Sequence, residues 1–376
     1  MKNKKIGIGI LVFLAIVLLI IGIKNIVSSN SSLKTIYGAV GGGKENLLAD
    51  EEFNKILNKK YKINVINDSW SNGKLVLNDV VRENGSKYDF IFFSDQRFYD
   101  YYKLPPNESK GEAQRYTVNK GSLTLNTPVV IYSWDTVVDA LIKEEIVTEK
   151  DGVYYISNMS KLLDYILEGK SWKDIGLDLY GKINIDSTDP VTSSPGATYY
   201  GLLASIMGGG RVSDDNIDEI LPKLKDFYKK SGYMNNTPAD LFQLYLKTGV
   251  GAKPMIVDYE KSIIDFANAD PEGYDSVKDK IRILYPSPTI WNSHCIASIS
   301  TNGNKYYDVF EDKDVQQLAW ERYGFRTGVT GGNYDVSKAK VKNIPQSIDG
   351  AVSSLKMDIY EKMIESLKNW GERNGK

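Results

Sequence analysis

Two polar loops in this 376-residue chain each follow a predicted strand and precede a predicted helix. The first loop, residues 38–45, reads GAVGGGKE and comes within one residue of the phosphate-binding P-loop pattern. It departs from that pattern at Glu45, where Ser or Thr would hold Mg²⁺. Gly41, Gly42 and Gly43 still let the backbone approach a ligand closely, with free N–H groups at the helix start that favour an anion or a polar oxygen. The alternative is a tight turn with no ligand.

The second loop, residues 189–196, reads DPVTSSPG and adds hydroxyl groups to the N–H groups of a helix start. The hydroxyls of Ser193 and Ser194 and the backbone up to Gly196 are therefore candidate ligand contacts. The alternative is a purely structural one, because serine is a favoured N-cap residue and Pro195 suits the first helical position.

Residues suited to covalent or metal chemistry are few. His294 is the only histidine and precedes the only cysteine, Cys295, but neighbouring side chains of an extended segment point to opposite faces. The sequence holds no Ser/His/Asp set and no zinc spacing, and the acids at Glu311, Asp312 and Asp314 lack the spacing of a calcium loop. The sequence therefore predicts a protein that is not an enzyme, with no cofactor and no metal, although catalysis by carboxylates alone stays open as an alternative.

The N-terminus predicts export. Residues 6–23 carry no charge and would span roughly 27 Å as a helix, close to the hydrocarbon thickness of a bilayer. Lys2, Lys4 and Lys5 precede this run while Lys24 follows it, so the positive-inside rule leaves a short tip in the cytoplasm and the globular part outside. We expect residues 1–32 to form this tip, a single-pass membrane anchor at about 6–23 and a linker.

A cleaved signal peptide is the alternative to the anchor, because Val27 and Ser29 form an acceptable cleavage site. A lipid anchor is excluded, since its cysteine would have to follow the apolar run, and one cysteine also excludes an intramolecular disulfide. Removing residues 1–24, which hold four lysines and no acids, moves the formal charge from −1 to −5. This mildly acidic surface argues against nucleic acid as a partner.

The remainder of the chain alternates strand-like and helix-like segments, which is typical of an α/β fold with a largely parallel sheet. Strands are predicted at 34–40, 61–66, 88–93, 128–132, 182–185, 253–257 and 280–285. Helices are predicted at 45–59, 134–143, 160–168, 197–207, 217–228, 238–248, 261–268, 312–323 and 355–370.

The order of four segments, at 183–207, 254–263, 281–290 and 321–325, resembles that of the type 2 periplasmic-binding-protein fold. The resemblance covers residues 33–376 and is strongest to the molybdate- and sulfate-type extracellular solute-binding proteins. It implies two lobes joined by crossing segments, with 33–132 plus 290–376 in lobe one and 133–289 in lobe two. A small-molecule or ion ligand between the lobes, a monomeric state and an ABC-type permease as partner follow from the same resemblance. A surface sensor or scaffold without transport is the alternative.

The resemblance also implies where the ligand binds. Carried onto this sequence, the ligand positions are Gly41, Gly42, Gly43, Ser94, Ser193, Ser194, Gly196, Asp258, Tyr259 and Glu260. Asp258 and Glu260 stand where the oxyanion binders offer a neutral donor, and a buried carboxylate would repel an oxyanion by several kcal/mol unless it is paired. Either Tyr259 supplies the donor while the acids face elsewhere, or the ligand carries a positive group or a metal.

Overall fold

The computed structural model describes residues 33–70, 88–106, 109, 116–232, 234–235, 237–329 and 334–373. The predicted membrane helix at 6–23 and its linker lie outside these residues. Within the described part of the chain, no helix is both long enough and apolar enough to cross a bilayer.

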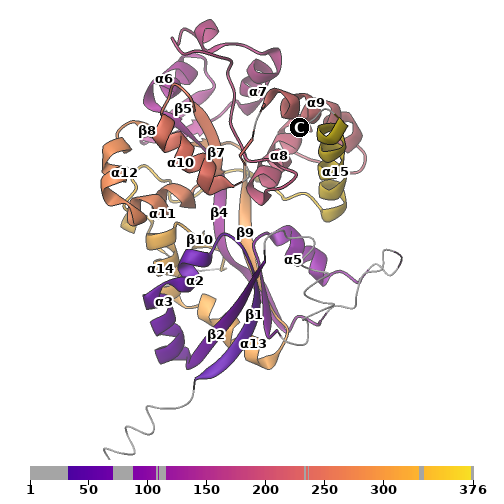
Figure 1. Cartoon of the computed structure of the whole chain (residues 1–376), viewed down its shortest axis with the longest axis vertical. Coiled ribbons are helices and arrows are strands. Elements are labelled where there is room, and N and C mark those ends of the chain that lie inside the picture. Colours follow the sequence, from indigo (N-terminus) through magenta and orange to yellow (C-terminus); the bar gives the residue numbers. More distant parts are fainter. Residues whose placement is uncertain are drawn as a thin grey trace, which may run out of the picture.

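Lobe one, the lower half of Figure 1, is built on strands in the order β2–β1–β3–β9–β4. The first three are parallel to one another, whereas β9 runs antiparallel to β3 and to β4. Strand β3 has the sequence FIFF and is buried at every position, because helices cover both faces of the sheet. The strands are β1 (Lys34–Gly41), β2 (Ile63–Trp70), β3 (Phe90–Phe93), β4 (Lys120–Trp134) and β9 (Thr289–Ser298).

Helices on the two faces of this sheet enclose two separate apolar clusters. One face carries α2 (Glu45–Ala49), α3 (Glu51–Ile56), a π-helical turn (Leu57–Tyr61), α13 (Thr301–Phe310) and α14 (Lys313–Tyr323). The other face carries α5 (Gln96–Lys103). The predicted helix at 45–59 is interrupted because Asp50 has an extended backbone and its carboxylate caps α3 by accepting hydrogen bonds from the N–H groups of Glu52 and Phe53.

Lobe two, the upper half of Figure 1, is built around the C-terminal half of β4, with β7 on one side and β8, β6 and β5 on the other. Its strands are β5 (Val147–Lys150), β6 (Val153–Ile156), β7 (Met255–Tyr259) and β8 (Ile281–Pro286). Its helices are α6 (Asp135–Lys143), α7 (Met159–Glu168), a 3₁₀ turn (Trp172–Ile175), α8 (Ser194–Met207), α9 (Ile217–Lys230), α10 (Pro238–Thr248), α11 (Lys261–Ala269) and α12 (Pro271–Val277).

Two long strands, β4 and β9, connect the lobes (Figure 1). Strand β4 pairs with β9 as far as Pro128 and then with β7 and β8 from Val129 onward, so a single strand belongs to both sheets. Both pairings are antiparallel, as is the β5–β6 hairpin. The sheet is therefore mixed: among the described strands, the predicted parallel pairing holds for β1 with β2 and β3, for β6 with β8, and for the short β11 (Ala351–Val352) with β9.

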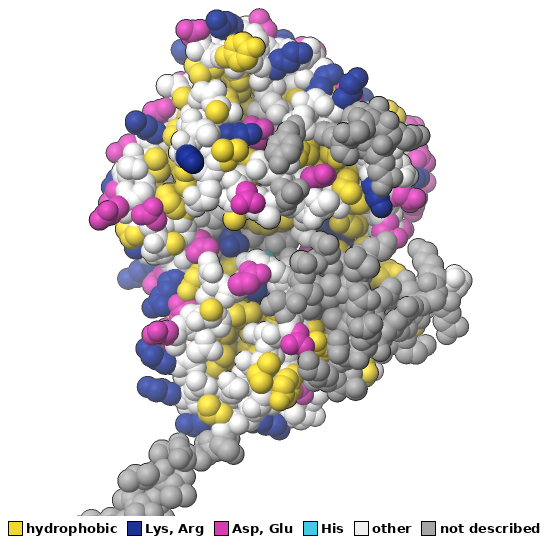
Figure 2. Space-filling view, viewed as in Figure 1, with side chains coloured by type: hydrophobic (Ala, Val, Ile, Leu, Met, Phe, Trp, Pro, Cys, Tyr) yellow, Lys and Arg dark blue, Asp and Glu magenta, His cyan; other side chains and the backbone are white. Residues whose placement is uncertain are grey.

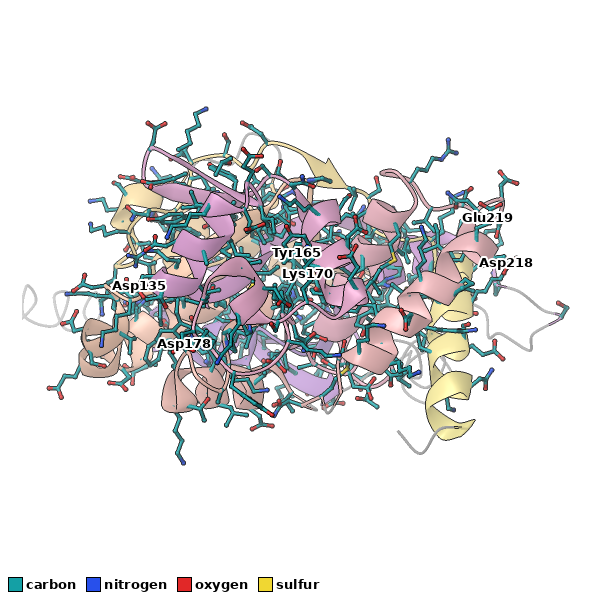
Figure 3. The ribbon with its side chains drawn as sticks, turned by 90° about the horizontal axis from the view of Figure 1, so that it is seen from above. Asp135, Tyr165, Lys170, Asp178, Asp218 and Glu219 are labelled. Atoms are coloured by element: carbon teal, nitrogen blue, oxygen red, sulfur yellow. The ribbon has the colours of Figure 1, made fainter. Side chains whose placement is uncertain are left out.

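The C-terminal segment runs from lobe one to lobe two. Its elements are β10 (Arg326–Thr327), a 3₁₀ turn (Val336–Lys338), β11 (Ala351–Val352) and α15 (Met357–Arg373). Helix α15 lies beside α9, where the Lys362 Nζ is 2.8 Å from an oxygen of Asp218 (Figures 1 and 3). Ile359, Met363 and Leu367 of α15 belong to the apolar core of lobe two. The predicted lobe one included all of residues 290–376. The elements β9, α13, α14 and β10 lie there, whereas α15 packs on lobe two, because an apolar stripe does not reveal which lobe will cover it.

Candidate functional site

A cleft of about 710 Å³ lies between the two lobes and draws its walls from both. Figure 2 shows the waist between the lobes, with acidic side chains above and below it. The lobe-one wall includes Gly42, Gly43, Asn46, Ser94, Asn292 and His294. The lobe-two wall includes residues 192–195, 237–239, Phe242, Gln243, Asp258, Tyr259, Lys261, Ser262, Asp265, Phe266, Ala269 and Asp270.

The glycine-rich loop after β1 brings its backbone to the cleft at Gly42 and Gly43. The Gly43 N–H donates to both carboxylate oxygens of Glu45, at 3.0 and 2.8 Å. This N–H group is therefore already hydrogen-bonded within the loop. Gly41 does not line the cleft: its carbonyl accepts a 2.5 Å hydrogen bond from the Lys44 Nζ. Burial lowers the pKa of the Lys44 ammonium to about 7. A side chain at Gly41 would lie 2.9 Å from the hydroxyl of Ser94, so glycine lets these two strand ends approach each other.

The start of α8 forms the second polar corner of the cleft. Ser193 is the N-cap residue but makes no side-chain cap, because its hydroxyl donates to the Thr188 Oγ1 at 2.9 Å. Ser194 is half-buried and lines the cleft together with Pro195. Gly196 does not line it: a Cβ there would lie 2.3 Å from the Thr188 carbonyl oxygen, so this glycine allows α8 to pack closely on the preceding segment.

The end of β7 brings Asp258 and Tyr259 to the cleft. The carboxylate of Asp258 accepts a 2.7 Å hydrogen bond from the Tyr259 N–H, and burial raises its pKa to about 6. The Tyr259 hydroxyl donates to the Thr198 Oγ1 at 3.5 Å, and burial raises the pKa of this tyrosine well above its ordinary value. The four predicted positions Ser193, Ser194, Asp258 and Tyr259 therefore converge on one wall.

Glu260 corrects the predicted site. Its side chain is fully buried and lies outside the cleft lining, in an ion pair with Arg326 of β10 at 2.6 and 2.9 Å. The Tyr285 hydroxyl donates a third hydrogen bond, of 2.7 Å, to the same carboxylate. With both oxygens occupied, Glu260 ties β10 and β8 to the start of α11 and is not available to a ligand.

Strand β9 contributes two cleft residues that were not predicted from the sequence. Asn292 and His294 are two residues apart on this crossing strand and both line the cleft, with the Asn292 Nδ2 3.2 Å from the His294 Nε2. Burial and the nearby Lys44 hold the pKa of His294 far below its usual range, so the ring is neutral. The Asn292 Oδ1 and the His294 Nδ1 are buried and have no hydrogen-bond partner among the residues that the structure describes. The two-residue spacing indicated that both side chains share one face of a strand. The pairing of β9 with β4 is needed to show that this face lines the cleft.

Comparison with known proteins supports the fold. No protein-family model and no curated protein matches the sequence. Among solved structures, an ABC transporter protein from Clostridium perfringens aligns with a TM-score of 0.56 and 15% identity, covering 90% of this chain and 99% of that one. The apo ferric ion-binding protein A from Pasteurella haemolytica aligns at 0.55 and 14%, covering 90% and 97%. The periplasmic binding protein AfuA from Actinobacillus pleuropneumoniae, with fructose-6-phosphate bound, aligns at 0.52 and 11%, covering 90% and 98%.

These neighbours have unlike ligands in their names, and at such low identity the likeness concerns the fold and not the ligand. It does not single out the molybdate- and sulfate-type group. The alignments nevertheless cover nearly the full length of each of these structures. The chain has the two-lobed α/β fold of the periplasmic and extracellular solute-binding proteins.

Proposed function

We propose that this protein is an exported solute-binding protein that captures a small ligand between its lobes and delivers it to an ABC-type permease. The cleft carries the proposal, because its polar groups come from both lobes, which β4 and β9 connect. A ligand that contacts both walls stabilises the closed arrangement relative to an open one, which couples binding to hinge closure.

In this proposal Gly42 and Ser94 hold the ligand from lobe one, whereas Gly43 lines the cleft with its N–H bound to Glu45. Hydrogen-bonding groups of lobe two face them, at Ser193, Ser194, Asp258 and Tyr259. Helix α8 is long enough to contribute its dipole, and its N-cap residue makes no side-chain cap. Pro195 has no N–H and Gly196 does not line the cleft, so the N–H of Ser194 is the group that this helix start offers to a ligand oxygen.

The first step of the test is to identify the small molecule that co-purifies with the protein. A native mass spectrum of the full chain, purified from its source in detergent, should contain a bound small molecule. Calorimetric titration should then show that Ser194→Ala weakens binding of that molecule roughly tenfold, about 1.4 kcal/mol, because a ligand hydrogen bond is lost.

Unfolding by urea without ligand provides the control for this variant. Ser194→Ala should change the unliganded free energy of unfolding by less than about 1 kcal/mol, since this hydroxyl caps no helix. If Ser194→Ala binds the molecule as tightly as the wild type and only unfolds more easily, then the start of α8 is not part of the binding site.

We further propose that residues 6–23 hold the domain at the outer face of the membrane as a single-pass helix. A protease added to intact cells should then degrade the chain from Leu33 onward, and the untreated domain should fractionate with membranes. A soluble protein in the medium that starts near Asn30 would instead identify the apolar run as a cleaved signal peptide.

A further inference from the structure

The charged groups of the cleft are mostly acidic. Asp258, Asp265 and Asp270 line it, against one ammonium group, that of Lys261. Lys261 is already engaged, with its Nζ 4.0 Å from an oxygen of Asp265, which also accepts a 3.2 Å hydrogen bond from Asn46. Asp270 caps α12 by accepting a hydrogen bond from the N–H of Gly273 at 2.9 Å. Two of the three carboxylates therefore have partners of their own at the mouth of the cleft.

Asp258 is different, because it is 4% exposed and no ammonium or guanidinium group of the described residues lies within ion-pair distance of it. Its carboxylate accepts hydrogen bonds from the Tyr259 N–H and the Ser262 hydroxyl, which are neutral donors. The Lys261 ammonium acts on this carboxylate only from beyond ion-pair distance, and a buried charge without a directly paired counter-ion is costly, so an oppositely charged ligand group would remove an existing penalty. An oxyanion in the same place would add one.

A second buried acceptor in the cleft is unused. The Oδ1 of Asn292 has no partner, while the Nδ2 of the same amide faces the imidazole of His294. An N–H group of a ligand would satisfy this oxygen. A protonated amine would meet two of these needs, a counter-charge at Asp258 and a donor at Asn292. The Nδ1 of His294, which carries the ring proton when Nε2 accepts from Asn292, would donate to an oxygen of the same ligand.

The lobe-two wall also presents aromatic surface. Phe242 of α10 and Phe266 of α11 meet at nearly a right angle, with ring centroids 5.9 Å apart, and both line the cleft beside Tyr259. Aromatic faces attract organic cations. A cleft of about 710 Å³ is the size that holds an organic molecule and would leave most of its volume empty around a tetrahedral oxyanion. The described residues also form no group of three or more histidines, cysteines or acids that could hold a metal ion.

We propose that this cleft takes a small organic cation, and in the first place a protonated amine, since a quaternary ammonium group would offer its charge to Asp258 but no N–H to Asn292. Its charged group lies against Asp258 and its apolar part lies on Phe242 and Phe266. The inference rests on the proposed function and names the chemical class of its ligand.

Calorimetric titration of the full chain in detergent tests this class directly. The cationic probes are ethanolamine, choline, butane-1,4-diamine and tetramethylammonium, and the anionic probes are sulfate, molybdate and citrate, all at millimolar concentration and low ionic strength. At least one cation should bind and no anion should. Asp258→Asn, which keeps the shape of the side chain, should weaken that binding tenfold or more.

The matched control is Asp139→Asn on the exposed face of α6, which removes the same charge far from the cleft and should leave the affinity unchanged. Binding of an anion and of no cation would overturn the inference, and closure of the lobes on that anion would show that the proposed function survives. The inference would also be overturned if none of the cations bound, or if Asp258→Asn left cation binding unchanged.

Discussion

Replacing Arg326 with methionine should lower the free energy of unfolding by about 3–5 kcal/mol. The guanidinium makes two hydrogen bonds to the fully buried carboxylate of Glu260, so the substitution leaves that negative charge unpaired inside the protein. The Tyr285 hydroxyl would remain as a neutral donor, which does not replace a counter-charge. Equilibrium unfolding in urea, without ligand, measures the loss.

The double variant Glu260→Gln/Arg326→Met is the control for this interpretation. Because it removes both charges, it should recover part of the stability lost in the single variant, and the difference measures the cost of the unpaired carboxylate. A loss below about 1 kcal/mol in Arg326→Met would mean that water reaches Glu260. The description of this residue as a buried structural anchor would then be wrong.

The stability of the unliganded protein should also depend on pH through Asp258. Burial raises the pKa of this carboxyl from 3.8 to about 6, so between these values the folded state keeps a proton that the unfolded state has lost. Stability from this group is therefore present at low pH and falls as the pH rises from about 4 to about 6. The shift corresponds to about 3 kcal/mol.

Comparison of the wild type with Asp258→Asn isolates this contribution from those of other acids. The variant cannot ionise, so its stability relative to the wild type should be higher at pH 7 than at pH 4 by about 3 kcal/mol in urea unfolding. Asp139→Asn, exposed on α6, should show no such difference. An equal effect of Asp258→Asn at both pH values would show that the carboxyl is solvated and carries no penalty that a ligand could relieve.

Local sequence patterns predicted most elements that position the cleft. The apolar run at 88–93 becomes β3, and the serine-proline pair at 194–195 starts α8, as expected from strand composition and helix-start chemistry. The β5–β6 hairpin, α5 and α13 were not predicted, because their residues are mixed in polarity and their burial depends on neighbours far away in sequence.

The sequence predicted the site residues that lie at the end of a strand or the start of a helix. It did not predict those whose contribution depends on the direction in which the side chain points. Asp258 and Glu260 are two residues apart and would share a face if the strand continued. Strand β7 ends at Tyr259, however, and Glu260 has helical dihedral angles, φ −52° and ψ −37°, and its side chain pairs with Arg326. Asn292 and His294 were missed for a related reason, since the pairing of β9 with a strand more than 150 residues earlier decides what they face.

Closure of the lobes around a ligand is the central claim, and a distance between them tests it most directly. Spin labels at Glu52→Cys on α3 and Lys247→Cys on α10 place one probe on each lobe, both at exposed positions outside the cleft lining. The native Cys295 is buried, and burial raises the pKa of its thiol, so it should not take up label. Pulsed electron spin resonance on the full chain should show a shorter distance when the co-purified molecule is added back to stripped protein. A ligand that binds tightly and leaves the distance distribution unchanged would contradict capture by hinge closure.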